Sequence, residues 1–238
     1  MSLFSARQHL ADATSVLVIT GAGISAESGI PTFRGEGGLW KGFQAQDLAT
    51  PQAFARDPKL VWEWYSWRRQ ICNEATPNAG HEALVHLEGR IERFLLTTQN
   101  VDGLHPRAGS RKLIEIHGCI DDARCTETGR VFPVEDGIWQ DGVLLHPDGT
   151  QARPHILWFG ENYWDGTLDV AHGFARKVDV CLVVGTSGMV YPPAALAVFA
   201  QRSGATLIEV NPRAGQVTPH ADIWLQGPSG EVLPEIVG

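Results

Sequence analysis

The chain has 238 residues, of which 43% are hydrophobic, so it is long enough to bury a full core and disorder is not expected. Its formal net charge of -8 argues against a general binder of nucleic acid or of acidic membranes, because such proteins usually present a basic face. We therefore expect one globular unit with no nucleic acid and no membrane among its partners. A local basic pocket remains compatible with these numbers.

The N-terminal stretch MSLFSARQHLADAT predicts a first amphipathic helix, because it has neither a long apolar run nor the cleavage-site pattern of a signal peptide. Nowhere does the chain hold about 18 uninterrupted apolar residues, the length that a membrane span needs. Of the four cysteines, Cys72 falls in a helical stretch and Cys181 in an apolar strand. A disulfide framework is therefore not expected, and a reducing cytoplasmic location fits.

Short apolar runs alternate with segments of helical spacing along most of the chain. This alternation predicts an α/β fold, in which a Rossmann-like parallel sheet is covered by helices on both faces. Ligands of such sheets bind beyond the carboxyl ends of the strands, so we expect the polar residues after each run to converge on one crevice. The predicted strands are Val16–Ile19, Phe94–Leu96, Leu113–Ile116, His155–Phe159, Val180–Val184, Leu207–Val210 and Ile223–Leu225.

Two stretches interrupt this rhythm. Residues 32–77 are rich in tryptophan and in helical spacing, whereas residues 118–154 hold short β-like runs separated by Asp-Gly turn signals. We interpret both as insertions that form a small lobe over the crevice of a single domain, residues 1–238. The large Rossmann-like lobe then covers approximately residues 1–31, 78–117 and 155–238. The turn signals are Asp136-Gly137, Asp141-Gly142 and Asp148-Gly149.

A glycine-rich loop, Gly21-Ala22-Gly23, follows the first predicted strand. Glycines let a backbone approach a pyrophosphate, and a following helix offers unpaired N–H groups. The same residues are compatible with a tight strand-to-helix turn that binds no ligand. The third glycine is not at the dinucleotide spacing, and no acidic residue ends the second strand. The short motif alone leaves both interpretations open.

The longer motifs favour a cofactor site. The string GAGISAESGIPTFR resembles the NAD loop of the sirtuins, and TQNVDGLH, EIHG, GTSGMVYP and VNP follow in the order that this family uses. The resemblance spans almost the whole chain and implies one sirtuin-type catalytic domain that removes acyl groups from lysine in protein or peptide substrates. In that family NAD is a reactant: the acyl oxygen attacks the ribose carbon as nicotinamide leaves, giving free lysine and O-acyl-ADP-ribose. A monomer is expected.

The resemblance also implies the roles of individual residues. His117 matches the base that removes a ribose hydroxyl proton, and an imidazole titrates near neutral pH. Asn100 and Asp102 complete the catalytic set by binding the nicotinamide amide and ordering the ribose. The implied cofactor-binding residues are Gly21, Ala22, Gly23, Ser25, Glu27, Ser28, Thr32, Phe33, Arg34, Trp40, Gln99, Asn100, Asp102, Gly185, Thr186, Ser187, Asn211 and Ser229.

Tyr65 and Arg68 are three residues apart in WEWYSWRRQ, so they share one face of a helix. With GEGGLWKGFQAQDLATPQAF and PNAGH, this stretch resembles the sirtuin branch that removes succinyl, malonyl and glutaryl groups, in which a Tyr-x-x-Arg pair binds the distal carboxylate. Ala45 matches a small residue that leaves room for the acyl tail, and acetyl-lysine should react more slowly. From spacing alone, Tyr65 merely packs and Arg68 is a solvated residue beside Arg69.

The string LWFGE matches the strand that pairs with the substrate peptide in this family. Main-chain hydrogen bonding of that kind gives binding with limited sequence preference. The implied substrate-binding residues of this string are Leu157, Phe159, Gly160 and Glu161.

The sequence departs from the family at its zinc site. Most sirtuins carry two Cys-x-x-Cys pairs that hold a structural zinc, whereas here Cys125 is the one cysteine left of the first pair and no second pair follows. We expect no structural zinc, although a mixed site from Cys119, Cys125, His146 and His155 is conceivable. A hydrophobic cluster is expected to replace the metal. Its predicted members are Val131, Phe132, Ile138, Trp139, Val143, Leu144 and Leu145.

Other functions share the cofactor motifs. A sirtuin-like NAD glycohydrolase or ADP-ribosyltransferase has no need of the Tyr65 and Arg68 pair. A non-catalytic NAD-sensing module does not require His117. A dehydrogenase fits less well, because no separate hydride-acceptor domain fits in this length.

Overall fold

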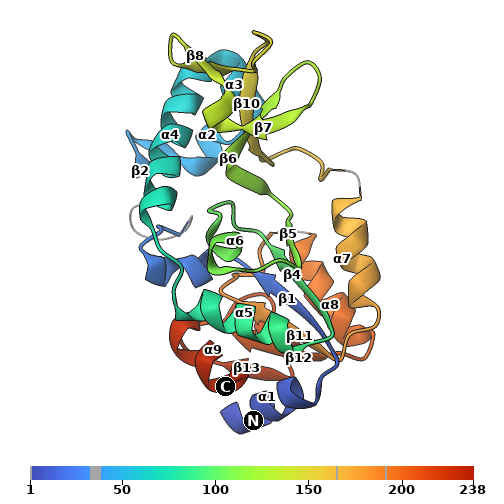
Figure 1. Cartoon of the computed structure of the whole chain (residues 1–238). Helices are drawn as coiled ribbons and strands as arrows, with labels where there is room; N and C mark the ends of the chain where they lie inside the picture. Colours follow the sequence, from blue (N-terminus) through green and yellow to red (C-terminus); the bar gives the residue numbers. More distant parts are fainter. Residues whose placement is uncertain (1, 33–38, 165, 191) are drawn as a thin grey trace.

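The structure, a computed structural model, describes residues 2–32, 39–164, 166–190 and 192–238. Its centre is a six-stranded sheet in the order β13-β12-β11-β1-β4-β5, in which every neighbouring pair is parallel (Figure 1). The predicted fold class is therefore confirmed. The strands of this sheet are β1 (Ser15–Thr20), β4 (Arg93–Thr98), β5 (Leu113–Glu115), β11 (Val180–Val184), β12 (Thr206–Val210) and β13 (Ile223–Leu225).

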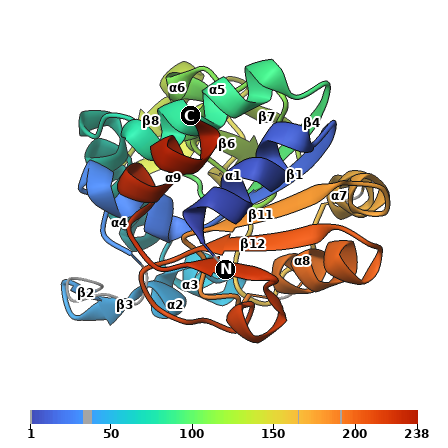
Figure 2. The same ribbon diagram turned by 90° about the horizontal axis from the view of Figure 1, so that it is seen from below.

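Helices cover both faces of this sheet, because its central strands are apolar on both sides. Val16 and Val18 pack into one cluster, with side chains of α1, α5 and α9. Leu17 and Ile19 point to the opposite face, where α7 and α8 lie (Figure 2). Each such aliphatic side chain contributes about 1.5–3 kcal/mol when fully buried. The helices are α1 (Leu3–Asp12), α5 (Ala79–Arg90), α6 (Leu104–Ala108), α7 (Thr167–Ala175), α8 (Pro193–Arg202) and α9 (Ser229–Val237), with 3-10 turns η1 (Ala22–Ser28) and η3 (Thr218–His220).

A smaller group of elements stands above the carboxyl edge of the sheet in Figure 1 and has a core of its own. Helix α4 packs there against a three-stranded antiparallel sheet of order β10-β6-β7. We call these elements the small lobe. They are β2 (Leu39–Trp40), β3 (Phe43–Gln44), α2 (Ala45–Leu48), α3 (Pro51–Arg56), α4 (Pro58–Glu74), β6 (Gly118–Cys125), β7 (Val131–Pro133), η2 (Val134–Asp136), β8 (Ile138–Gln140), β9 (Val143–Leu145) and β10 (Ala152–Ile156).

The prediction of a strand at His155–Phe159 in the parallel sheet is wrong. The strand is β10, Ala152–Ile156, and it pairs antiparallel with β6 in the small lobe. Its residues alternate between buried and half-buried, as in an antiparallel strand with one covered face. An apolar run shows that a strand is favoured, but it does not identify the partner of that strand.

Two of the Asp-Gly pairs that predicted turns adopt different structures. Asp141 and Gly142 have φ angles of 51° and 85° and join β8 to β9, so the predicted hairpin turn is confirmed. Gly137 instead follows the 3-10 turn η2 with a φ of -83°.

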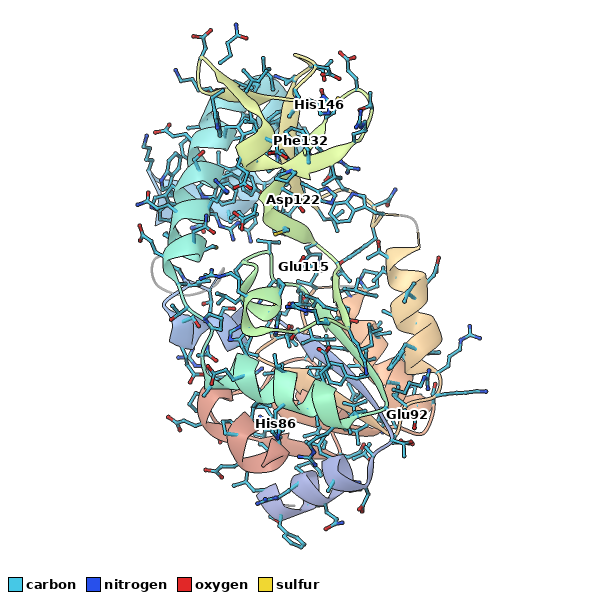
Figure 3. The ribbon with its side chains drawn as sticks, viewed as in Figure 1. His86, Glu92, Glu115, Asp122, Phe132 and His146 are labelled. Carbon is cyan, nitrogen blue, oxygen red and sulfur yellow. The ribbon has the colours of Figure 1, made fainter. Side chains whose placement is uncertain are left out.

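The expected hydrophobic cluster forms only in part. Phe132 and Leu144 are buried, and the ring of Phe132 lies edge-on to His146 at 5.0 Å between centroids (Figure 3). Three predicted members are exposed by about half: Val131, Ile138 and Trp139.

The N-terminal helix and the free thiols agree with expectation. Helix α1 covers most of the predicted stretch, and all four cysteines are free. Among the described residues, no helix combines the length and the apolar character that crossing a membrane requires.

Asp179 fastens the start of β11 to the start of β1. Its Oδ2 accepts hydrogen bonds from the backbone N–H and the hydroxyl of Thr14 and of Ser15, at 2.8–2.9 Å. These bonds, the Ser15 hydroxyl first, hold the pKa of Asp179 below its ordinary value. A lowered pKa in the folded state means that the carboxylate stabilises the fold above its unfolded pKa of about 4 and that this contribution is lost as pH falls further.

We expect Asp179→Ala to lower the free energy of unfolding at pH 7 by about 1–2 kcal/mol, the usual effect of losing hydrogen bonds to a charged group. The difference from wild type should shrink as pH falls below about 4. Urea denaturation across this pH range measures it. Glu92→Ala, which removes an exposed carboxylate, is the matched control and should change little. A loss that does not vary with pH would contradict the assignment.

Candidate active site

The carboxyl ends of four neighbouring strands, β12, β11, β1 and β4, lie at one edge of the sheet. β1 lies between β11 and β4, so the chain leaves the sheet in opposite directions on either side of it, the position at which open α/β sheets bind ligands. The tips are tied together by backbone bonds. Gly21 N–H donates to Val184 O, and Gln99 N–H donates to Thr20 O, each at 3.0 Å. The predicted convergence of the strand tips is therefore present.

The glycine-rich loop allows two backbones to touch. Gly23 N–H donates to Gly185 O at 2.8 Å, and a Cβ atom on Gly23 would lie 2.6 Å from that oxygen. A Cβ on Gly21 would lie 2.8 Å from the Cβ of Thr186. Side chains at these positions would fill the space between the loop and the tip of β11. The predicted helix after the loop is the 3-10 helix η1, Ala22–Ser28, rather than an α-helix.

A buried hydrogen-bond network links the loop to the tip of β4. The Ser25 hydroxyl donates to Asp102 Oδ2 at 2.7 Å and accepts from Asn100 Nδ2 at 3.0 Å. Asp102 Oδ1 also accepts from Leu104 N–H at 3.0 Å. All three polar residues of the network are less than a tenth exposed. Such a network fixes the side chains in one arrangement, because breaking it would leave buried polar groups unpaired.

Burial of Asp102 disfavours the charged form of its carboxyl group. Burial raises the pKa of the carboxyl group, and the hydrogen bonds from Leu104 and Ser25 and the positive charge of Arg68 counteract this. Arg68 therefore lies close enough to Asp102 to act on it, although it comes from the small lobe.

His117 lies in the short link between β5 and β6. Its Nδ1 lies 3.0 Å from Gln99 O, and its Nε2 lies 2.8 Å from the hydroxyl of Tyr163. Burial lowers the pKa of His117, and the bond to Gln99 opposes the shift. The imidazole is therefore neutral at neutral pH, the form in which it can accept a proton. Sequence reasoning missed Tyr163, which no motif contains.

Carboxylates gather close to this link. Glu115 ends β5, and burial together with the charges of Asp122, Asp102 and Asp121 raises its pKa to about 7. Figure 3 labels Glu115 at the top of the large sheet and Asp122 above it on β6.

Three other predicted cofactor residues, Gln99, Thr186 and Asn211, also contact one another. Gln99 Nε2 donates to Thr186 Oγ1 at 3.2 Å, and Asn211 Nδ2 donates to Thr186 O at 2.8 Å. Ser187 continues the same tip and accepts from Met189 N–H. The structure therefore gathers the residues predicted at the tips of β4, β11 and β12.

The remaining predicted residues lie around the loop or in the small lobe. Glu27 accepts a hydrogen bond from Gly230 N–H, next to Ser229 at the start of α9, and Ser28 accepts one from Asn78. Trp40 packs against Trp67, with ring centroids 6.2 Å apart. Ala22 begins η1 and Thr32 lies beyond it, whereas Phe33 and Arg34 lie outside the described residues.

The proposed acyl pair lies on α4, where Tyr65 is buried and Arg68 is half-buried. The hydroxyl of Tyr65 accepts a hydrogen bond from Trp158 Nε1 at 2.9 Å, and burial raises the pKa of Tyr65 to about 12. The guanidinium of Arg68 lies 5.0 Å from the ring centre of Trp64 and 5.9 Å from that of Tyr65. Ala45 packs against the same core. Tyr65 therefore packs in the core of the small lobe, as helical spacing alone suggested. Its hydroxyl accepts from Trp158 and still has its own hydrogen to donate.

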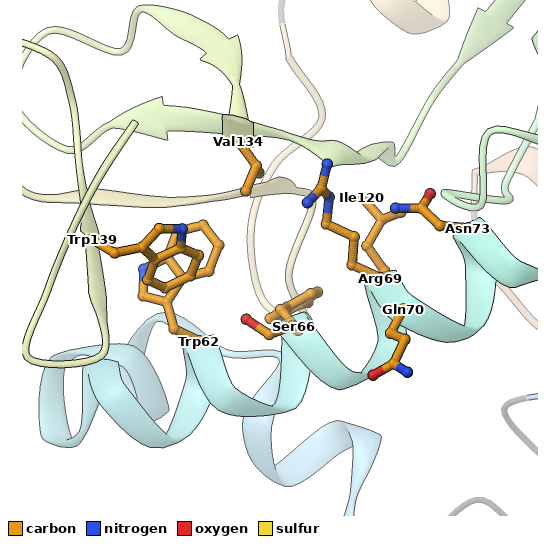
Figure 4. A pocket seen from close by; sticks show the side chains of 9 residues that line it. Trp62, Ser66, Arg69, Gln70, Asn73, Ile120, Val134 and Trp139 are labelled. Carbon is orange, nitrogen blue, oxygen red and sulfur yellow. The ribbon is translucent and has the colours of Figure 1, made fainter. Parts of the chain in front are cut away.

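A cavity of about 150 Å³ lies between α4 and the strands of the small lobe, and Tyr65 is one of its lining residues (Figure 4). Trp62, Arg69 and Trp139 are among its lining residues. Arg69 also pairs with Asp121 at 2.7 Å. Consecutive arginines of α4 thus face different environments.

The predicted peptide-pairing segment is not a regular strand. The N–H groups of Leu157 and Phe159 donate to His117 O at 2.9 Å and to Ala49 O at 3.0 Å. Glu161 pairs with Arg153 and accepts from Trp158 N–H at 2.8 Å, while Gly160 adopts a φ of 86°. These N–H groups are therefore already engaged.

Known proteins resemble this chain along nearly its full length. The model of the Sir2 family matches residues 21–192. An NAD-dependent protein deacylase of Leptospira interrogans serogroup Icterohaemorrhagiae serovar Lai (strain 56601) is 51% identical over 226 residues, covering 93% of this chain and 91% of the relative. NAD-dependent protein deacylase 2 of Pyrobaculum aerophilum is 47% identical over 228 residues, covering 96% and 92%.

Solved structures of Sir2 proteins also resemble this chain along nearly its full length. The crystal structure of a complex between a Sir2 homologue and NAD has a TM-score of 0.92 at 42% identity and covers 98% of this chain and 92% of its own. A complex of Sir2, a p53 peptide and NAD+ has a TM-score of 0.89 at 31% identity, covering 99% and 97%.

The site and fold define the class: a Rossmann-like α/β protein whose buried polar network and neutral imidazole meet at the carboxyl edge of its sheet. The chain belongs to the Sir2 family, the sirtuins, as its ordered motifs predict.

We expect Gly185→Ala to disrupt this edge. Gly185 has a φ of 62°, and an added Cβ would lie 2.4 Å from Ile24 N. Stability should fall by at least about 1–2 kcal/mol, the penalty for a left-handed side chain, and NAD affinity should fall at least tenfold because the loop is displaced. Calorimetry measures both. Gly173→Ala, on α7 with open space around it, is the control and should not destabilise the protein. Equal stability and equal NAD affinity of the two variants would contradict the close contact between the backbones of Gly185 and the loop.

Proposed function

We propose that this chain is an NAD-dependent protein-lysine deacylase acting on acylated lysine in proteins or peptides. The observation that carries the proposal is the neutral imidazole of His117 at the strand edge, beside the buried network of Asn100, Ser25 and Asp102. The relatives named as NAD-dependent protein deacylases support it. The four free thiols are compatible with a reducing, cytoplasmic location.

The residues present fit NAD. The loop of Gly21 and Gly23 has no room for side chains beside Gly185, which suits a close backbone approach to phosphates. Thr186, Ser187 and Asn211 would hold the adenosine half, while Asn100 and Asp102 would hold the nicotinamide and its ribose. When bound, NAD supplies the ribose carbon that accepts the acyl oxygen as nicotinamide leaves. His117 would take the proton of a ribose hydroxyl at Nε2.

The acyl pocket favours an acidic group such as succinyl, malonyl or glutaryl. Arg68 supplies positive charge on α4, and it acts electrostatically on Tyr65 and on Asp102. The Tyr65 hydroxyl accepts from Trp158 and keeps its own hydrogen for a carboxylate. A guanidinium and a phenol together suit a distal carboxylate better than a methyl group.

The peptide would bind along the segment from Leu157 to Glu161. Because the N–H groups of Leu157 and Phe159 donate within the chain, the peptide would use carbonyl oxygens of the segment as acceptors. Side-chain preference should then be weak.

A glycohydrolase or an ADP-ribosyltransferase would share the cofactor residues but would not need Tyr65 and Arg68. The discriminating experiment incubates the protein with NAD and matched succinyl-, acetyl- and unmodified lysine peptides and follows products by mass spectrometry. Consumption of NAD without a change in peptide would favour the glycohydrolase. Binding of NAD without consumption would favour the sensing module.

We expect Arg68→Met to lower kcat/KM for a succinyl peptide by about tenfold to a hundredfold, the effect of losing a hydrogen-bonded ion pair, and for an acetyl peptide by much less. Arg69→Met is the matched control, because Arg69 pairs with Asp121 and lines the other cavity. It should preserve the succinyl preference. Equal losses on both peptides in Arg68→Met would remove the case for an acidic acyl group. His117→Ala should abolish both reactions.

We further propose that the small lobe folds without zinc. Cys125 Sγ accepts from Thr128 N–H and lies 3.0 Å from Thr150 Oγ1. The side chain of Thr128 first, then the Thr150 hydroxyl and Thr128 N–H, lower the pKa of the thiol to about 7. No cluster of three His, Cys, Asp or Glu residues suited to a metal occurs in the described ranges. Phe132, Val134 and Leu144 supply buried apolar contacts in this region.

Metal analysis of protein purified without chelator should find far less than one zinc per chain. Treatment with a chelator should leave the melting temperature unchanged, because no folding free energy would come from a metal. About one zinc per chain, with a lower melting temperature after chelation, would contradict the proposal.

A further inference from the structure

Two links between the lobes touch at His117. The first runs from β5 to β6 and contains His117 itself. The second, residues 157–166, runs from β10 to α7, and none of its described residues lies in a helix or strand (Figure 1). Tyr163 in the second link places its hydroxyl 2.8 Å from His117 Nε2, with the two ring centroids 5.6 Å apart.

The direction of the hydrogen bonds around His117 follows from its partners. Gln99 O can only accept, so Nδ1 carries the hydrogen of the neutral ring. Nε2 then has one lone pair, and the Tyr163 hydroxyl donates to it. Burial raises the pKa of Tyr163 to about 12, so the hydroxyl keeps its hydrogen at neutral pH.

We propose that Tyr163 is a positioning residue that occupies the proton-accepting nitrogen of His117 until a ribose hydroxyl replaces it. The inference rests on the proposed role of His117 as the base. One lone pair accepts one strong hydrogen bond, so Tyr163 and the ribose hydroxyl exclude each other at Nε2. Until then, Tyr163 keeps the imidazole in the orientation and in the tautomer that the reaction requires.

The surroundings of Tyr163 allow this exchange. Its link is irregular, so moving it breaks no strand pairing. The next residue, Trp164, holds the link to the small lobe by stacking on His155 at 4.4 Å between centroids, with Arg124 5.5 Å from its ring. Movement of the small lobe would therefore carry Tyr163 toward or away from His117.

Tyr163→Phe tests the proposal, because it removes the hydroxyl and keeps the ring. In the cofactor-free protein, the pKa of His117 followed by NMR should rise by about 0.5–1 unit, since the neutral imidazole loses a donor. The charged groups near this link, Asp102, Glu115, Asp121 and Asp122, are common to both proteins. With saturating ADP-ribose as the probe, the pKa of His117 should be the same in the two proteins.

Kinetics supply the second readout. Tyr163→Phe should lower KM for NAD about twofold to fivefold and leave kcat within about twofold, because the hydroxyl is displaced before the reaction. The acidic limb of kcat/KM should move up with the pKa of the free enzyme, and that of kcat should not. Asn162→Ala is the control: it alters an exposed side chain of the same link and should leave the pKa of His117 unchanged.

The outcomes distinguish the proposed role of Tyr163 from the proposed role of His117 as the base. An unchanged pKa of His117 in cofactor-free Tyr163→Phe overturns the hydrogen bond. If Tyr163→Phe has a lower kcat and an unchanged KM for NAD, the Tyr163 hydroxyl acts in the bound state. That result overturns its displacement from His117 by the ribose hydroxyl. Full activity of His117→Ala would refute the base while leaving the NMR result on Tyr163 interpretable.

Discussion

The site depends on the contact between two glycine backbones. Gly23 N–H donates to Gly185 O at 2.8 Å, and neither residue has room for a Cβ. This contact sets the distance between the loop after β1 and the tip of β11. It also sets the position of Ser25, two residues further on, which joins Asp102 to Asn100. A shift of the loop would break the bonds that join these three buried side chains and leave Asp102 with only the bond from Leu104 N–H among those described.

His117 connects this rigid edge to the small lobe. Its imidazole lies in the link between β5, which ends at Glu115, and β6, which contains Asp122. The backbone carbonyl of His117 accepts from Leu157 N–H, so the second link is attached to the first on the main chain as well as through Tyr163. The proposed base and the proposed peptide-binding segment are therefore held by the same crossing of the chain.

Helix α4 separates two environments within the small lobe. Its Arg68 side acts on Asp102 and Tyr65, whereas Arg69 pairs with Asp121 beside the cavity of Figure 4. Two adjacent residues of one type thus differ in role because a helix turns by about 100° per residue.

The sequence by itself determined the parallel sheet, the glycine loop and the set of residues at the strand tips, because apolar periodicity and ordered local motifs record them directly. Tertiary structure decided what periodicity cannot express: the pairing of β10 with β6, the exposure of Ile138 and Trp139, and the engagement of Leu157 and Phe159 N–H groups. It also decided the contact between Tyr163 and His117, residues 46 apart that belong to no common motif. Partners in space are set by the packing of whole elements, and a local pattern carries no record of that packing.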